Sequence, residues 1–119
     1  FPLAAESDRL KISVGAVRDS VYGIDAESSW FWKWVQQATG IDFEVVQVLD
    51  TAVAEKKTLM FATDDLPEIL FGYGFTTDEL VKYGMGEGQL LAMNADVNAD
   101  VMPYLTAWFD LYPEAKAYC

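Results

Sequence analysis

Six polar and aromatic side chains are candidates for binding a small ligand, because they stand where loops are expected to follow β-strands. Flat aromatic rings can cover the C–H patches of a sugar, and carboxylate or guanidinium groups can hydrogen-bond its hydroxyls. Apolar walls with a few placed polar groups are the general composition of a binding pocket. For each residue alone, a role in loop structure is at least as good an interpretation, but as a set we expect ligand contact. The candidates are Arg18, Asp19, Tyr22, Asp50, Tyr73 and Phe75.

Catalytic chemistry finds little support in the sequence. The chain has no histidine to act as a base near neutral pH, and neither a nucleophile elbow nor a phosphate-binding glycine loop is present. Asp64 and Asp65 could form an acid–base pair, but adjacent aspartates on a turn more often cap a helix or face water. We therefore expect a protein that is not an enzyme and that uses no cofactor.

One acidic run superficially resembles a calcium-binding loop. It extends from Asn94 to Asp100 and reads NADVNAD. It lacks the central glycine and the terminal bidentate glutamate of an EF-hand loop. We expect a solvated linker or a helix cap here, and no metal site.

The charge balance excludes some partners. The chain of 119 residues has 8 basic and 19 acidic residues, a net charge of −11. Such a field repels nucleic-acid phosphates and anionic lipid, so we expect neither as a partner and interpret the acidity as a source of solubility. The one cysteine, Cys119, permits no internal disulfide. The sequence has no run of 18 apolar residues, which is the pattern that would predict a membrane span.

Hydrophobic periodicity predicts how the first half of the chain positions the candidates. Apolar and polar residues alternate over 10–16, as in a strand. Apolar residues then recur at helical spacing from Trp30 to Ala38, and Gly40 provides a C-cap. The valine-rich stretch 43–49 predicts a buried parallel strand.

The next segment predicts a second helix and a third strand. Asp50 or Thr51 caps the helix, and a strand at 67–72 ends in the sequence Gly-Tyr-Gly. Strands that alternate with helices pair in parallel through right-handed crossovers. Within this helix, Val53, Met60 and Phe61 are expected on the inner face, with Glu55, Lys56 and Lys57 toward water.

Three shorter helices are predicted after the third strand. Thr76 and Glu79 fit a capping box for a helix that ends at Gly84. Pro103 and Pro113 suit first helical turns. The last two helices are predicted at about 101–110 and 113–118.

Several stretches, in the right order, resemble the family 1 extracellular solute-binding proteins. The run LMFATDDLPEILFGYG is similar to the family's LMLASGDLPDIIFG. The family's first strand is similar to the stretch LKISVGAV, and its next helix and second strand are similar to WFWKWVQQATGIDFEVVQV. The family's "DLVKYG" segment is similar to TTDELVKYGMGEGQLLAMN, and the helices that follow it are similar to MPYLTAWFDLYPEAKAYC. The likeness is closest to the lipoprotein-anchored members from Gram-positive bacteria and covers nearly the whole chain.

The resemblance implies a fold and a function. It implies an α/β, periplasmic-binding-protein-like lobe with a parallel sheet of three or more strands in the order 2-1-3, flanked by helices. Family members capture a solute, usually a sugar or oligosaccharide, outside the cytoplasm and deliver it to an ABC permease. They have two lobes, so residues 1–119 are expected to be the N-terminal part of lobe 1, without the second lobe. The resemblance also implies a lipoprotein signal upstream. Because the chain begins Phe-Pro-Leu, it is expected to be processed or trimmed.

The aromatic residues are assigned to core or surface by helical geometry. Trp30 and Trp34 share a helical face and are expected to pack on the sheet. Trp32 diverges from both by about 200° and is expected to face solvent, a second lobe or a ligand. The core is expected to contain Phe31, Trp34, Phe43, Phe61 and Phe71.

Two other functions remain open at this point. One is a small flavodoxin-like enzyme, for which AVRDSVYG would be a poor phosphate or flavin loop. The other is an interaction module that docks a partner on Trp32 and on a surface with Tyr104 and Trp108. In a lobe fragment, the same aromatic surface would be core uncovered by truncation and would favour self-association.

Overall fold

The computed structural model describes residues 10–26, 28–93 and 96–118. The chain divides into two compact units, residues 1–76 and residues 77–119. The predicted lead-in at residues 1–9 and Cys119 lie outside the described residues.

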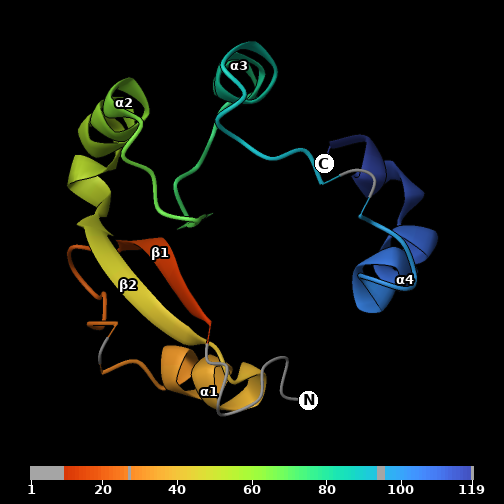
Figure 1. Ribbon diagram of the computed structural model, residues 1–119, viewed down its shortest axis with the longest axis horizontal. Helices are drawn as coiled ribbons and strands as arrows, with labels where there is room; N and C mark the ends of the chain where they lie inside the picture. Colours follow the sequence, from red (N-terminus) through yellow and green to blue (C-terminus); the bar gives the residue numbers. More distant parts are fainter. Residues whose placement is uncertain (1–9, 27, 94–95, 119) are drawn as a thin grey trace. The chain divides into compact units, whose positions relative to one another are not determined.

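The first unit is built on a three-stranded parallel sheet. Its strands are β1 (Lys11–Arg18), β2 (Asp42–Leu49) and β3 (Ile69–Phe71), in the order β2-β1-β3. β1 lies beside β2 over its full length (Figure 1), and β3 adds a short pairing on the other side of β1. The predicted α/β fold with a 2-1-3 parallel sheet flanked by helices is confirmed.

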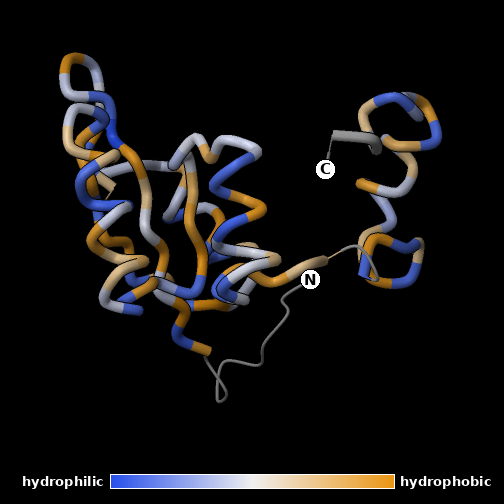
Figure 2. The backbone as a smooth tube through the Cα atoms, turned by 90° about the horizontal axis from the view of Figure 1, so that it is seen from above, coloured by the Kyte–Doolittle hydropathy of each residue, from blue (hydrophilic) through white to orange (hydrophobic). Residues whose placement is uncertain are grey.

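The two long helices of this unit lie on opposite faces of the sheet. The chain moves in one direction from β1 to β2 and in the other from β2 to β3, so right-handed crossovers place the two connecting helices on opposite sides. Rings of α1 (Trp30–Thr39) contact Phe43 and Phe71 on one face. Met60 of α2 (Val53–Thr63) packs with Val48 on the other face. In Figure 2, helical turns accordingly lie on both sides of the strands.

The tryptophans of α1 face the opposite way from the prediction. Trp32 packs on the sheet, with its ring centroid 5.9 Å from Phe43 and 6.0 Å from Phe71. Trp30 and Trp34 are 73% and 58% exposed. The reason is visible only over the whole helix. The face of Trp30 and Trp34 continues into the polar residues Lys33 and Gln37, whereas the sheet-facing side continues into half-buried Val35, Ala38 and Thr39.

The other core predictions had mixed outcomes. Phe61 is buried at 3% exposure, as predicted, and Phe43 is half-buried. Phe31 and Phe71 stack on each other with centroids 6.4 Å apart. They remain 37% and 55% exposed, so their contact lies at the margin of the core.

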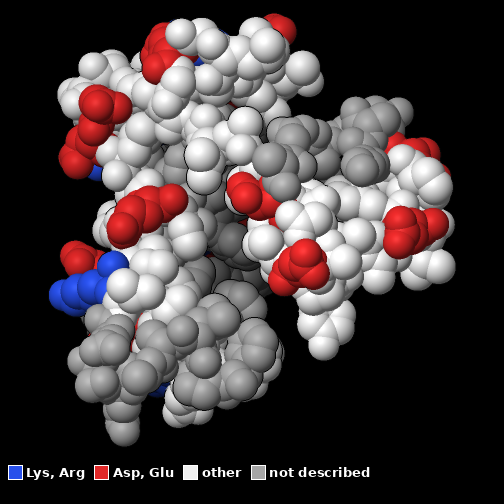
Figure 3. All heavy atoms as spheres, turned by 45° about the vertical axis from the view of Figure 1, so that its right-hand side comes forward, with Lys and Arg blue, Asp and Glu red and all other residues white. Residues whose placement is uncertain are grey.

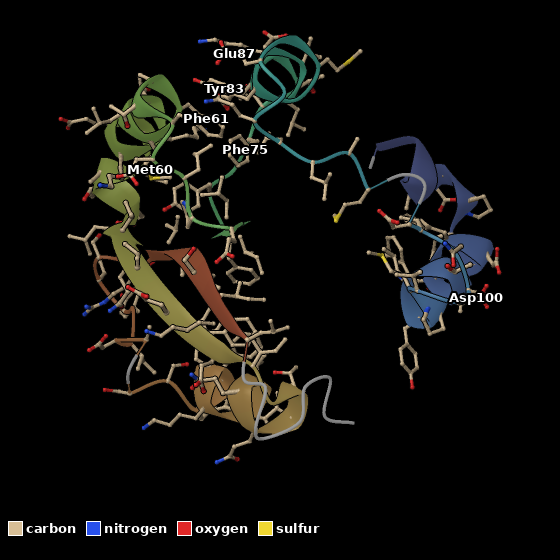
Figure 4. All side chains as sticks on the ribbon, viewed as in Figure 1. Met60, Phe61, Phe75, Tyr83, Glu87 and Asp100 are labelled. Atoms are coloured by element: carbon tan, nitrogen blue, oxygen red, sulfur yellow. The ribbon has the colours of Figure 1, made fainter. Side chains whose placement is uncertain are left out.

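Lys57 of α2 is buried, although the sequence pattern directs it toward water. Its side chain is 7% exposed. The Nζ atom lies 4.9 Å from the centroid of the Phe75 ring and donates a hydrogen bond to the carbonyl oxygen of Gly74 at 3.4 Å. A lysine stem can cover apolar surface while its charged end finds a carbonyl and an aromatic face. Figure 4 shows Phe75 beside Met60 and Phe61, which come from the same helix as Lys57.

A close approach of the backbone completes this core. Tyr73, 3% exposed, packs with Val48 and Met60. A Cβ atom at Gly15 would stand 2.7 Å from the Tyr73 hydroxyl oxygen. The absence of a side chain on β1 at this point therefore makes room for the tyrosine ring.

The second unit contains helical segments. α3 (Thr77–Leu80) begins one residue after the predicted cap, and the chain continues as a π-helical turn, Val81–Gly86, past the predicted end at Gly84. α4 (Pro103–Leu111) and a 3-10 helix (Pro113–Tyr118) follow near the predicted positions. In the described part of the chain, no helix has the length and apolar character needed to cross a bilayer.

Candidate functional site

An open pocket of about 360 Å³ lies at the carboxyl end of β1. It is bounded by the end of that strand, the loop that follows it, the start of α1 and one residue of β2. Ala16, Ile24 and Trp32 supply apolar wall, and Arg18, Asp19 and Gln47 supply polar groups. The carboxyl end of a parallel strand is the usual position of a ligand site in open α/β folds.

Arg18 is the last residue of β1 and is half-buried at the pocket wall. Its Nε atom donates to the carbonyl oxygen of Gly23 at 3.0 Å. A Cβ at Gly23 would lie 2.5 Å from Arg18 Cγ and 2.2 Å from the Asp19 carbonyl oxygen. Only glycine therefore lets the loop close over the arginine stem in this way.

Asp19 closes the turn that follows β1. Its Oδ1 atom accepts the backbone N–H groups of Tyr22 at 2.6 Å and of Val21 at 2.7 Å. These bonds, with that from Tyr22 the larger effect, hold the pKa of the Asp19 carboxyl below its ordinary value. The pocket rim therefore carries an ionised carboxylate at neutral pH.

Gln47 positions the pocket loop and is not among the residues predicted from the sequence. Its Oε1 atom accepts the N–H of buried Ala26 at 3.1 Å, and its Nε2 atom donates to Asp25 Oδ1. The one available signal was a single amide side chain in an otherwise valine-rich strand. An amide side chain on a strand that is expected to be buried needs a hydrogen-bond partner.

Asp50 joins two neighbouring loops at the same edge of the sheet. Its Oδ1 atom accepts N–H groups from Ser20, after β1, at 3.2 Å and from Thr51, after β2, at 2.7 Å. Asp50 does not line the pocket, although it fixes the loop that does. Tyr22 lines the pocket and is 87% exposed.

The structure brings Arg18, Asp19 and Tyr22 together, but it places Tyr73 and Phe75 elsewhere. Tyr73 is buried on the opposite face of the sheet, and burial raises the pKa of its hydroxyl. Phe75 stacks on Tyr73 with ring centroids 6.5 Å apart and meets Phe61 edge-on at 5.7 Å. Arg18, Asp19 and Tyr22 thus line one pocket, whereas Asp50, Tyr73 and Phe75 do not line it.

The reason for this difference is the turn after β3. Gly72 has a φ of +81°, a left-handed conformation that favours glycine. The chain turns there, and Tyr73 packs against β1 at Gly15. Tyr73, an aromatic residue that follows a strand end, is thus buried in the core.

Asp64 and Asp65 have a structural role, as expected for adjacent aspartates on a turn. Asp64 is the C-cap of α2 in the left-handed conformation, with a φ of +55°, and its N–H bonds to Met60 O. The N–H of Asp65 donates to the same oxygen at 3.1 Å.

Within the described ranges, no cluster of three His, Cys, Asp or Glu residues could hold a metal ion. The first residue of the acidic run, Asn94, lies outside those ranges. Further along the run, the Oδ1 atom of Asn98 accepts the N–H groups of Asp100 at 3.0 Å and of Val101 at 3.1 Å. This side chain therefore forms a local turn.

The pocket lining includes one arginine and one aspartate, in a chain whose net charge is −11. On the face drawn in Figure 3, acidic groups are scattered and do not gather in one patch. Comparison of the chain with protein-family models, with curated proteins and with solved structures gives no match. The side chains that line the pocket offer one guanidinium, one carboxylate, one amide, one serine hydroxyl and aromatic surface.

Proposed function

We propose that this chain is part of the first lobe of an extracytoplasmic solute-binding protein that captures a carbohydrate for an ABC importer and performs no catalysis. The resemblance of its sequence segments to family 1 solute-binding proteins supports this proposal. So does the 2-1-3 parallel sheet, which is the sheet order that the resemblance implies. In the natural protein, the chain is anchored outside the cytoplasm as a lipoprotein and delivers its solute to a membrane permease.

One observation carries most of the proposal, namely the composition of the pocket at the end of β1. Its volume of about 360 Å³ is within the range of small-molecule sites. Trp32 and Tyr22 provide aromatic surface for the C–H face of a sugar ring. Arg18 and Asp19 provide a donor and an acceptor for hydroxyl groups.

Lobe closure is the proposed mechanism. The pocket is open, and Tyr22 at its rim is largely exposed, so a second lobe would be needed to enclose a solute. Hinge closure around the solute would supply that second wall. The solute drives closure only through the additional contacts that it makes in the closed state.

The test is titration calorimetry with the neutral sugars maltose, cellobiose, xylobiose and raffinose and with the acidic sugar digalacturonate, on both the natural full-length protein and this 119-residue chain. We expect the full-length protein to bind one of these sugars and to contract in X-ray scattering, and the chain alone to bind at least about a hundredfold more weakly. Tight sugar binding by the chain alone would contradict lobe closure. A natural reading frame that stops after Cys119 would also overturn the proposal.

A protein-interaction module is the second candidate, and one observation favours it. Tyr104 and Trp108 on α4 are 90% and 45% exposed, and exposed aromatics often mark contact surfaces. Sedimentation of the chain over a range of concentrations tests for self-association through this surface. A Tyr104→Ser, Trp108→Ser variant should then remain monomeric where the parent chain associates.

A further inference from the structure

Arg18 is a cation without a carboxylate partner in the described part of the chain. Its Nε atom bonds a backbone carbonyl, and no described Asp or Glu is paired with it. An arginine has five N–H donors, so four of them, on the two terminal nitrogens, have no hydrogen-bond partner among the described residues. In a protein of net charge −11, a half-buried arginine without an acidic partner calls for an explanation.

The fixed position of the guanidinium favours recognition of a planar anion. Gly23 holds Nε through its carbonyl oxygen, and the tight loop confines the arginine stem beside it. A guanidinium held in this way loses little freedom when its remaining donors bind two oxygens side by side. Carboxylates and phosphates both offer that geometry.

The surrounding charges favour a carboxylate over a phosphate. Asp19 at the pocket rim is ionised, and its lowered pKa keeps it so at neutral pH. A phosphate monoester carries nearly two negative charges at neutral pH and would meet more repulsion in this acidic protein than a singly charged carboxylate. A sugar acid also offers hydroxyls that Asp19 can accept.

We propose that the solute carries a carboxylate, as a hexuronic acid or a uronic-acid-containing oligosaccharide does, and that the terminal nitrogens of Arg18 bind this group in a bidentate manner. This inference rests on the proposed solute-binding function and narrows its substrate class. The aromatic wall of Trp32 would then face the sugar ring.

The experiment is an NMR titration of the ¹⁵N-labelled chain that follows the side-chain Nε–H signal of Arg18, identified by its loss in Arg18→Gln. The probes are sodium D-glucuronate, D-glucose and glucose 6-phosphate at about 1–20 mM, the range in which a half-site lacking its second wall would bind. Sodium chloride added to the same ionic strength controls for screening. We expect a saturable shift with glucuronate, a much smaller one with glucose 6-phosphate and none with glucose.

Variants then separate recognition from general charge. Arg18→Gln should weaken glucuronate binding, followed at backbone signals of the pocket loop, by at least about tenfold. Arg18→Lys should give an intermediate affinity, since an ammonium cannot form the two-pronged contact. Lys33→Gln removes the same charge from an exposed position on α1 and should change the affinity less than about twofold.

Each other result overturns the inference. An Arg18 signal that ignores glucuronate, or that responds equally to glucose, shows a purely structural arginine. A stronger response to glucose 6-phosphate assigns the site to phosphate. Calorimetry of the full-length protein separates the two proposals. If it shows closure around a neutral sugar, the importer function stands without the carboxylate. If glucuronate binds at Arg18 but no closure occurs, the anion site stands without the importer function.

Discussion

The side-chain oxygen of Gln47, on β2, accepts the backbone N–H of Ala26, in the loop after β1, at 3.1 Å. Ala26 is buried, at 8% exposure, so removal of this acceptor leaves a backbone donor without a partner away from water. We expect Gln47→Leu to lower the free energy of unfolding by about 1–3 kcal/mol. Urea unfolding followed by tryptophan fluorescence measures the change.

Gln37→Leu on the exposed side of α1 is the matched control, and it should change stability by less than about 0.5 kcal/mol. Gln47→Glu gives a second comparison. It retains an oxygen that can accept the N–H of Ala26. It also replaces the amide nitrogen, which in the parent chain donates to Asp25 Oδ1, with a second carboxylate oxygen that faces Asp25. Equal stability of the Leu and Glu variants with the parent chain would show that this contact does not hold the loop.

The sheet could be predicted from sequence because its signals are local. The period-two alternation of apolar and polar residues predicted β1, and a valine-rich run predicted β2. The left-handed Gly40 that ends α1 was visible as a glycine after the last apolar residue. Handedness rules predicted parallel pairing through right-handed crossovers, and the family resemblance alone implied the strand order 2-1-3.

The composition of the site could be predicted only in part, because it depends on contacts between distant residues. Arg18, Asp19 and Tyr22 were found because they adjoin a strand end. Tyr73 also adjoins a strand end, yet its ring packs into the space beside Gly15 and is buried in the core. No local pattern encodes a partner that lies 58 positions away in the sequence, between Gly15 and Tyr73 (73 − 15).

The close approach of Gly15 to Tyr73 predicts an overpacking effect. A Cβ at position 15 would stand 2.7 Å from the tyrosine oxygen and 2.9 Å from Pro67 Cγ, and neither atom lies at the end of a long flexible chain. We expect Gly15→Ala to destabilise the protein by about 1–3 kcal/mol. Thermal and urea unfolding both report this loss.

Gly84→Ala is the control for this substitution, because the nearest atom to its added Cβ would be 3.9 Å away. The Tyr73 hydroxyl has no hydrogen-bond partner among the residues that the structure describes, so Tyr73→Phe should leave stability unchanged or raise it by up to about 1 kcal/mol. It should also relieve part of the cost of Gly15→Ala. Additive effects in the double variant would show that the two residues do not meet.

The reversed orientation of α1 gives a prediction about two tryptophans two positions apart. Trp32 contacts Phe43 and Phe71, whereas Trp30 is 73% exposed. Trp32→Ala should therefore cost about 2–4 kcal/mol, and Trp30→Ala should cost less than about 0.5 kcal/mol. Urea unfolding followed by far-ultraviolet circular dichroism avoids dependence on the tryptophan signal. If Trp30→Ala proved the more damaging change, the helix would be turned the other way.

The link between Glu68 and Ser13 predicts a dependence of stability on pH. Glu68 Oε2 accepts the Ser13 backbone N–H at 2.6 Å and the Ser13 hydroxyl at 2.9 Å. The backbone bond first, and then the hydroxyl bond, hold the pKa of Glu68 below its ordinary value of 4.5. The folded state therefore binds this proton less readily than the unfolded state. The resulting stabilisation is complete above the unfolded pKa and is lost as the pH falls through the folded pKa.

Glu68→Gln should accordingly be less stable than the parent chain at pH 7, and the difference should vanish at about pH 2–3. Urea unfolding of both proteins across this range measures the convergence. Ser13→Ala removes the hydroxyl, which donates to Glu68 Oε2 and accepts the Glu68 backbone N–H at 3.0 Å, and keeps the Ser13 backbone donor. The pKa of Glu68, followed by ¹³C NMR of its carboxyl carbon, should therefore rise in that variant but stay below 4.5. A difference between Glu68→Gln and the parent chain that is the same at every pH would mean that the ionised carboxylate does not contribute through this contact.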